Sequence, residues 1–263
     1  MIRARRSIGP SSFFLILGRE KYMSVKQLFY KICLITLLTP ISLVHAEIII
    51  HGTRAVYPSD AREITLQLSN DGKSPSLVQV WIDEGDPSST PDQSKAPFIL
   101  TPPISRVEGQ KSQFIRITSL PTVNTLSKTE ESLFWLNVLD IPPKPSAQDK
   151  TAAPDNFLQL AVRSRIKLFY RPSGIKQDVV LAPEKIQWRS TGSNLLAKNP
   201  TPFHITITSI TQENAGKTID ILSEGLMLKP FSEQSVLLKS SNTQNMTFTT
   251  INDYGGRVTH KIK

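Results

Sequence analysis

Hydrophobic and polar residues alternate with a period of two along most of the chain after residue 46. In Glu63–Ser69, for example, Ile64, Leu66 and Leu68 share one face of an extended segment, as in a half-buried β-strand. The same alternation predicts strands over Leu77–Asp83, Gln113–Thr118, Leu133–Leu139, Phe203–Thr208, Ser235–Leu238, Asn245–Ile251 and Arg257–Ile262. Turn residues such as Asn70-Asp71-Gly72 and Asn252–Gly256 separate these segments. Many short strands with such turns between them predict an all-β sandwich architecture.

One alternating segment is unusually long. Leu158–Tyr170 would span roughly 43 Å as a single strand, whereas an ordinary strand has about 5–6 residues. One face would carry the apolar residues Leu158, Leu160, Val162, Ile166, Leu168 and Tyr170. The other face would carry the cations Arg163, Arg165 and Lys167.

The sequence Arg171-Pro172-Ser173-Gly174 interrupts the pattern, because proline ends regular pairing and glycine permits a change of direction. We therefore predict two sandwiches of about 125 and 90 residues, over 47–170 and 171–263. One larger sandwich is the alternative. The segment Ile141–Asn156, rich in proline, alanine and charge, is predicted to be an exposed loop leading into the long strand.

Residues 1–46 have the pattern of a leader. A basic region with Lys26 and Lys31 precedes the apolar segment Ile32–Val44, and small side chains at Val44 and Ala46 predict signal-peptidase cleavage after Ala46, with Met23 as an alternative start. The apolar segment is too short for the ~20 residues of a membrane anchor, so we expect none after processing. The chain has 31 Lys and Arg, 22 Asp and Glu and a formal charge of +9, but 24 basic and 21 acidic residues remain after residue 46. The resulting +3 does not indicate a nucleic-acid partner.

The candidate chemistry argues against an enzyme. The single cysteine, Cys33, lies in the leader, so the mature chain has no disulfide and no thiol nucleophile. His51, His204 and His260 are widely separated and show no metal-ligand spacing, and we predict no metal and no cofactor. His204 alternates with apolar residues and is predicted to lie on a solvent-facing side of its strand.

The cations allow two interpretations. Arg163, Arg165 and Lys167, with Arg54 in a second strand candidate, Thr53–Tyr57, near the mature N-terminus, could form a solvated face that discourages edge aggregation. They could also bind an anion, and a carboxylate fits the low mature charge better than a polyanion does. The residue pattern alone does not separate the two.

Five stretches of the sequence resemble the PapD-like periplasmic pilus chaperones of the chaperone-usher pathway. They occur in order across nearly the whole mature chain and read TRAVY (53–57), ESLFWLNVLDIPPKP (131–145), RIKLFYRP (165–172), NPTPFHIT (199–206) and INDYGG (251–256). The resemblance implies two immunoglobulin-like domains set at an angle and a periplasmic location. It also implies that an incomplete pilus subunit receives a strand from the chaperone, which delivers it to an outer-membrane usher.

The resemblance also implies roles for particular residues. Leu158, Leu160 and Val162 would enter the subunit groove from the donated strand. Arg54 and Lys167 would anchor the subunit's C-terminal carboxylate. Glu131, Arg171 and Asp253 would form an ionic network between the domains; three unrelated surface charges are the alternative.

One departure concerns the loop before the donated strand. Long-loop members of the family typically carry a disulfide there, and the mature chain has no cysteine, so we predict the short-loop class. Self-association of the free protein, which would shield the donor strand, stays open. The other functional alternative is a secreted sandwich that is itself a structural or adhesive subunit, although such a subunit would have a single incomplete sandwich.

Overall fold

The computed structural model describes residues 47–144, 159–214, 216–222, 224–238 and 245–262. The predicted leader and most of the predicted loop Ile141–Asn156 lie outside these residues. Within them the regular elements are β-strands and three short 3-10 helices, at Pro91–Gln93, Pro121–Thr125 and Pro183–Lys185. No described helix is long and apolar enough to cross a membrane.

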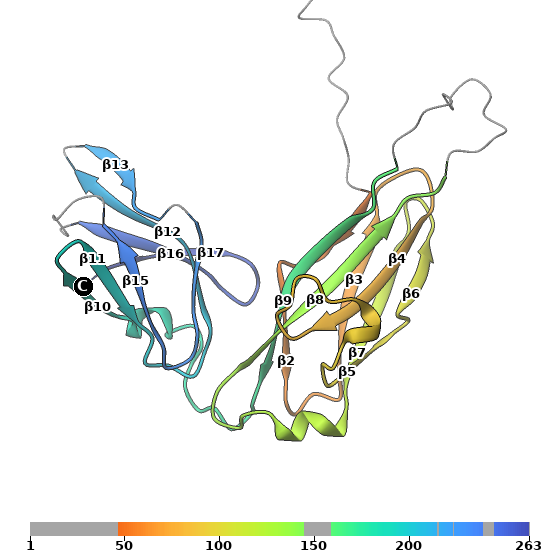
Figure 1. The fold of residues 1–263 in the computed structure, drawn as a ribbon, viewed down its shortest axis with the longest axis horizontal. Coiled ribbons are helices and arrows are strands. Elements are labelled where there is room, and N and C mark those ends of the chain that lie inside the picture. Colours follow the sequence, from red (N-terminus) through yellow and green to blue (C-terminus); the bar gives the residue numbers. More distant parts are fainter. Residues whose placement is uncertain (1–46, 145–158, 215, 223, 239–244, 263) are drawn as a thin grey trace, which may run out of the picture. The chain divides into compact units, whose positions relative to one another are not determined.

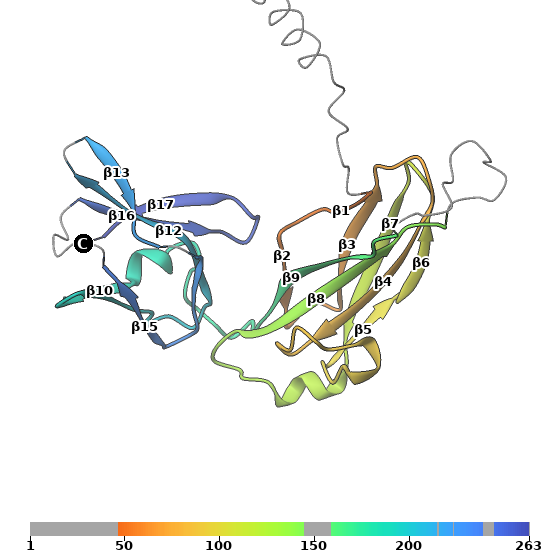
Figure 2. The ribbon, with the colours of Figure 1, turned by 45° about the horizontal axis from the view of Figure 1, so that its top comes forward.

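The first sandwich consists of two sheets (Figures 1 and 2). One sheet has the strand order β1 (Ile48–Ile50), β3 (Glu63–Asn70), β7 (Ser112–Ser119), β5 (Phe98–Thr101). The other has the order β2 (Arg54–Pro58), β9 (Val162–Arg171), β8 (Ser132–Ile141), β4 (Ser76–Asp83), β6 (Ile104–Val107). The apolar side chains predicted from alternation fill the space between these sheets, including Leu66, Leu68, Val78, Val80, Ile82, Ile115, Ile117, Phe134, Leu136 and Val138.

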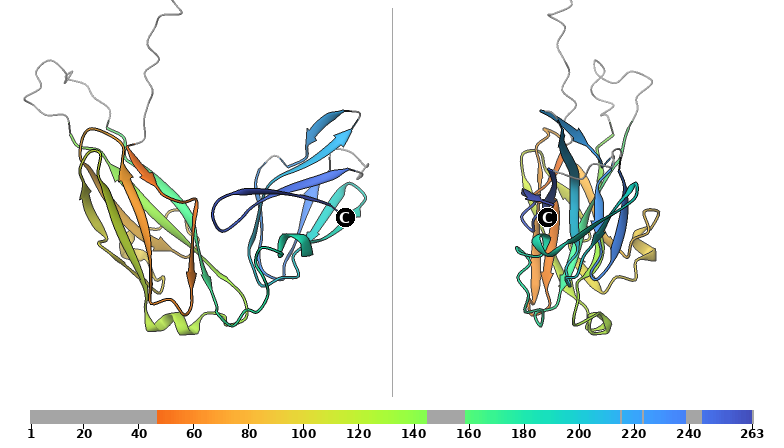
Figure 3. Two further views of the ribbon diagram at one scale, coloured as in Figure 1. Left: turned by 180° about the vertical axis from the view of Figure 1, so that it is seen from behind. Right: turned by 90° about the vertical axis from the view of Figure 1, so that its left-hand side faces the viewer.

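The second sandwich has its own core, formed by Leu195, Ala197, Phe203, Ile205, Ile207, Ile210, Leu228, Val236, Met246 and Phe248 among others. One sheet has the order β10 (Gln187–Thr191), β11 (Asn194–Lys198), β15 (Glu233–Leu237). The other has the order β13 (Lys217–Asp220), β12 (Ile205–Asn214), β16 (Met246–Ile251), β17 (Arg257–Lys261), with β14 (Leu226–Leu228) also paired to β12. Figure 3 shows the layers from two further sides. The predicted all-β fold with two sandwiches is confirmed, and the single larger sandwich is excluded by the two separate cores.

The long strand is shorter than predicted. β9 begins at Val162, Gln159–Ala161 are not in a strand, and Leu158 lies outside the described residues. The pairing partner explains the late start, because Val162 pairs with Asp140 close to the end of β8. Pro142 follows that strand, and proline has no N–H to continue a ladder. The downstream half has the predicted orientation, with Ile166, Leu168 and Tyr170 packed in or against the core.

β2 runs parallel to β9 along the edge opposite β8. The register pairs Arg54 with Lys167 and Pro58 with Arg171. The backbone of β2 therefore covers only the second half of β9, and no described strand pairs with that edge over residues 162–166.

Candidate functional site

Arg54 and Lys167 lie side by side at the start of the parallel β2–β9 ladder. Each is held by one oxygen of the second sandwich. Arg54 Nη1 donates to the carbonyl oxygen of Ile251 at 3.0 Å, and Lys167 Nζ donates to Thr206 Oγ1 at 3.0 Å. The ion pairs identified among the described residues include neither cation. Both acceptors are neutral, so the two positive charges stay uncompensated at short range.

Burial affects the acid–base properties of both cations. Burial, together with the neighbouring Arg54 charge, lowers the pKa of Lys167 from 10.5 to about 8. Burial also lowers the pKa of Arg54, although the carboxylates of Asp253 and Glu131 oppose this effect. At both residues the loss of water is the largest cause of the pKa shift, and none of the ion pairs between described residues includes either cation. A bound carboxylate would reverse this penalty at both residues.

Glu131, Arg171 and Asp253 form a connected ionic network. Arg171 Nε donates to Glu131 Oε1 at 2.7 Å, while its Nη1 and Nη2 donate to the Asp253 carboxylate at 2.6 and 3.0 Å. Burial alone would lower the pKa of Arg171, but these two carboxylates raise it. Because Arg171 and Glu131 belong to the first sandwich and Asp253 to the second, the network joins the two.

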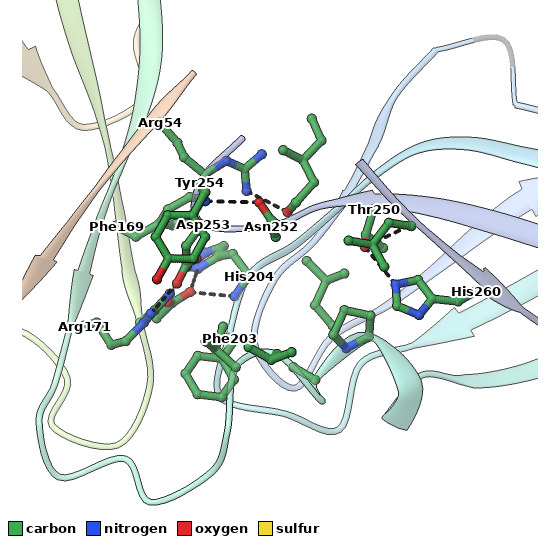
Figure 4. A pocket seen from close by; sticks show the side chains of 18 residues that line it. Arg54, Phe169, Arg171, Phe203, His204, Thr250, Asn252, Asp253, Tyr254 and His260 are labelled. Carbon is green, nitrogen blue, oxygen red and sulfur yellow. Dashed lines mark hydrogen bonds and ion pairs between the residues drawn. The ribbon is translucent and has the colours of Figure 1, made fainter. Parts of the chain in front are cut away.

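His204 is buried, so the predicted solvent-facing position is wrong. Its side chain is 5% exposed, its backbone N–H donates to Glu131 Oε2 at 2.8 Å, and its ring lies 5.5 Å from that of Phe169. Alternation along its own strand could not reveal that residues of the first sandwich cover this face. A cavity of about 180 Å³ next to this contact is lined by Arg54, Phe169 and His204 and by Tyr254 from the turn after β16 (Figure 4).

Arg163 and Arg165 have different partners from the other two cations. Arg165 Nε donates to Asp83 Oδ2 at 3.1 Å, its Nη2 contacts Asp83 Oδ1, and Arg163 Nη2 lies 3.7 Å from Asp83 Oδ2. Arg163 also donates to Asn137 Oδ1. Although burial would raise the pKa of Asp83, hydrogen bonds from Arg165, Asn137 and the Gly85 amide bring it below its usual value.

The same two arginines stack on tryptophans. The guanidinium carbon of Arg163 is 4.6 Å from the ring centre of Trp81, and that of Arg165 is 4.4 Å from that of Trp135. Sequence reasoning missed this cluster, because its members come from three strands. The sequence did contain a signal. Asp83 follows Trp81 by two residues on β4, and Asn137 follows Trp135 by two residues on β8, so the two members of each pair point to the same side of the sheet.

Two of the three predicted donor residues, Leu160 and Val162, lie in the part of the chain that the structure describes. Leu160 is 63% exposed and Val162 is 51% exposed, although both are large apolar residues. Leu158 lies outside the described residues. Within the described ranges, no group of three or more His, Cys, Asp or Glu side chains is arranged to hold a metal ion.

Comparison with known protein families identifies the class of protein to which this two-sandwich chain belongs. The family profile described as "Pili and flagellar-assembly chaperone, PapD N-terminal domain" matches residues 47–176, and "Pili assembly chaperone PapD, C-terminal domain" matches residues 181–262. The chain belongs to this PapD-like chaperone family, and the resemblance drawn from the sequence is confirmed.

Individual relatives support this assignment. The chaperone protein MrkB of Klebsiella pneumoniae is 44% identical over 218 residues, which cover 82% of this chain and 90% of MrkB. The crystal structure of the YadV chaperone is 36% identical, with a TM-score of 0.67 over 82% of this chain and all of that one. The CupB2 chaperone of Pseudomonas aeruginosa is 34% identical, with a TM-score of 0.68 over 81% and 98%. A chain of the Salmonella enterica SafA pilin–SafB chaperone complex is 25% identical, with a TM-score of 0.67 over 83% and 98%.

Proposed function

We propose that the mature protein is a periplasmic chaperone that captures a pilus subunit by donating a strand and anchors the subunit's C-terminal carboxylate on Arg54 and Lys167. The observation that carries the proposal is the placement of these two cations. They are neighbours in the β2–β9 register and half-buried, and each donates to a neutral oxygen and lies 5.8 Å from the centre of an aromatic ring, Phe169 for Arg54 and Trp135 for Lys167. A carboxylate between them would form charge-assisted hydrogen bonds with both.

The donated segment is the stretch that leads into β9, with Leu158, Leu160 and Val162 as the residues that enter the subunit. The exposure of Leu160 and Val162 supports this role, because large apolar side chains in water gain free energy when a partner covers them. Full burial of a Leu or Val contributes about 1.5–3 kcal/mol, so three would contribute roughly 5–9 kcal/mol before ordering costs. The pilin–chaperone complex of SafA and SafB supports a subunit as the partner.

The Glu131–Arg171–Asp253 network fixes the orientation of the two sandwiches in this proposal. Ion pairs of this kind often contribute little net stability, because desolvation offsets the attraction. The proposed domains are 47–170 and 171–263, so that the proposed boundary falls at Arg171, the last residue of β9 in the first sandwich. An outer-membrane usher receives the loaded chaperone, and no chemical reaction is involved.

The periplasmic location rests on the predicted cleavage after Ala46, and the relative titled "Periplasmic Chaperone SfaE" supports it. N-terminal sequencing of the secreted protein should give Glu47 as the first residue. Any other first residue would refute the cleavage site.

The test of capture is co-expression with candidate subunits encoded beside this chain's gene, followed by purification from the periplasm. The wild-type chaperone should co-purify with one subunit, while Arg54→Ala and Lys167→Ala should be recovered folded but alone. Arg62→Ala and Lys111→Ala, which remove exposed cations elsewhere, are the matched controls. Normal subunit recovery with Arg54→Ala or Lys167→Ala would refute the anchor.

The donor segment has a separate test. Leu160→Asp or Val162→Asp should abolish co-purification, because a carboxylate cannot enter an apolar groove without a large desolvation cost. Leu237→Asp is the control, since Leu237 is 69% exposed in the second sandwich. Equal losses from all three variants would show that the effect is not specific to the donor segment.

A further inference from the structure

The turn Asn252–Gly256 joins β16 to β17, and the chain from Ile251 to Gly255 contacts the first sandwich at three places. Figure 4 shows one of them, where Asp253 lies beside Arg171. Just before the turn, the carbonyl of Ile251 accepts the hydrogen bond from Arg54. Within it, Asp253 binds Arg171. At its tip, Gly255 lies against Thr53, the residue that precedes Arg54.

The turn is closed by its own hydrogen bonds. The Asn252 side-chain Oδ1 accepts from the backbone N–H groups of Tyr254 at 3.1 Å and Gly256 at 2.8 Å. The Asn252 backbone donates to the Gly256 carbonyl at 2.9 Å and accepts from the Gly255 N–H at 3.0 Å. A turn braced in this way moves as a unit, so a displacement at Gly255 is transmitted to the Ile251 carbonyl.

Gly255 is the point of closest approach. Its φ of +84° lies in the left-handed region, and a Cβ built on it would lie 2.7 Å from Thr53 Oγ1. That separation is well below an ordinary non-bonded contact, and positive φ disfavours residues with a side chain. A side chain at this position would therefore require either that the exposed Thr53 side chain rotate its hydroxyl away or that the turn move away from Thr53, and with it the acceptor of Arg54.

The acceptor itself suits an anion-binding arginine. A carbonyl oxygen orients the guanidinium without neutralising it, whereas a carboxylate in the same place would compete with the ligand. The Nε atom of Arg54 is buried and has no hydrogen-bond partner among the described residues. Since arginine loses up to about 2 kcal/mol of side-chain entropy when it is ordered, orienting it before binding strengthens capture.

We propose that Gly255 is a positioning residue for the carboxylate anchor: its missing side chain lets the turn rest on Thr53, so that the Ile251 carbonyl holds Arg54 ready for the subunit's carboxylate. The inference rests on the proposed function. It adds to the anchor an uncharged residue that would act through the position of Arg54 and not by touching the subunit's carboxylate.

The experiment compares Gly255→Ala with Gly192→Ala. Gly192, in the turn between β10 and β11, also has positive φ (+59°), but its Cβ would meet nothing within 4 Å, so it controls for backbone strain in the same sandwich. The probe is the C-terminal peptide of the subunit that co-purifies with the wild-type chain, synthesised as the free acid and as the amide. The readout is the ratio of the two affinities, which loss of stability alone would not change.

The wild type and Gly192→Ala should prefer the acid over the amide, and Gly255→Ala should lose that preference by roughly tenfold, the value of one hydrogen bond to a charged group. The double variant Gly255→Ala/Arg54→Ala should match Arg54→Ala alone, because both changes remove the same interaction. Thr53→Ala should restore part of the preference in Gly255→Ala, because it removes the obstructing hydroxyl.

The outcomes distinguish failure of the proposed anchor from failure of the positioning role of Gly255. If Arg54→Ala leaves the acid preference unchanged, or no subunit co-purifies with the wild type, the proposed anchor is wrong. If Arg54→Ala removes the preference but Gly255→Ala keeps it, or if the two losses add, the positioning role of Gly255 is wrong and the anchor stands.

Discussion

Four cations share one face of β2 and β9, yet they divide into two pairs with different surroundings. Arg163 and Arg165 contact the buried carboxylate of Asp83 and stack on tryptophans. Arg54 and Lys167 are held by a carbonyl and a hydroxyl of the second sandwich. The first pair has its counter-charge within the fold, in Asp83, whereas no ion pair of the described residues includes a member of the second pair, as the proposed carboxylate anchor requires.

The largest expected effect comes from replacing Asp83, the carboxylate that contacts Arg163 and Arg165. Asp83→Ala leaves two partly buried arginines without their carboxylate and should lower the free energy of unfolding by about 3–5 kcal/mol. Urea unfolding measures this change. Asp60→Ala, at an exposed aspartate of the same sandwich, should stay within about 0.5 kcal/mol of wild type. A loss below about 1 kcal/mol at Asp83 would mean that this pair is not structural.

The second prediction uses the lowered pKa of Lys167. Between about pH 8 and 10.5 the folded chain has lost the Lys167 proton while the unfolded chain keeps it, so the free energy of unfolding should rise with pH relative to Lys167→Gln. Capture of the subunit carboxylate needs the charged amine and should fall over the same window, by up to about tenfold per pH unit. The two pH dependences therefore have opposite signs.

The control for this pH dependence is Lys167→Arg, which stays charged in this range and should capture with a flat pH profile. A falling profile in Lys167→Arg would show that another group titrates. Urea titrations and peptide binding at pH 7, 8, 9 and 10 provide both curves.

Two methionine variants, one in each cation pair, compare the effects on stability and on subunit capture. Arg165→Met removes a partner of buried Asp83 and should cost roughly 2 kcal/mol of stability while capture persists. Lys167→Met should leave stability unchanged or raise it, because a desolvated charge disappears, while capture is lost. Measuring unfolding and co-purification for both variants tests the division directly. If both lost stability and kept capture, the two pairs would be equivalent.

The smallest expected effect is at Thr206→Val, which keeps the shape of the side chain and removes the hydroxyl that accepts from Lys167. Peptide affinity should fall by about two- to twelvefold, since a single hydrogen bond contributes about 0.5–1.5 kcal/mol. Thr208→Val, on the same strand, is the control and should bind as wild type does. A loss as large as that of Lys167→Met would mean that Thr206 contacts the ligand itself.

Local pattern predicted the parts of the fold that depend on one strand at a time. β3, β4, β7 and β8 alternate cleanly, and their apolar residues form the core as expected. The predicted start of β9 at Leu158 was wrong, because the length of a strand depends on where its partner ends. Asp83 and His204 could not be placed from the sequence, because each is buried by residues remote in the chain. The role of Gly255 depends on a close approach that sequence pattern does not encode.

The parallel register of β2 and β9 has a consequence for what the open edge can accept. No strand of the described residues pairs with residues 162–166 of β9 along this edge, and at Lys167 the same edge is already occupied by β2, beginning with Arg54. A guest chain pairing along this edge toward Lys167 would meet the backbone of β2 after about five residues and could go no further. A loop passing through would collide, whereas a chain that stops there fits. In the proposed capture, this edge accepts the free end of the subunit chain and places that end next to Arg54 and Lys167.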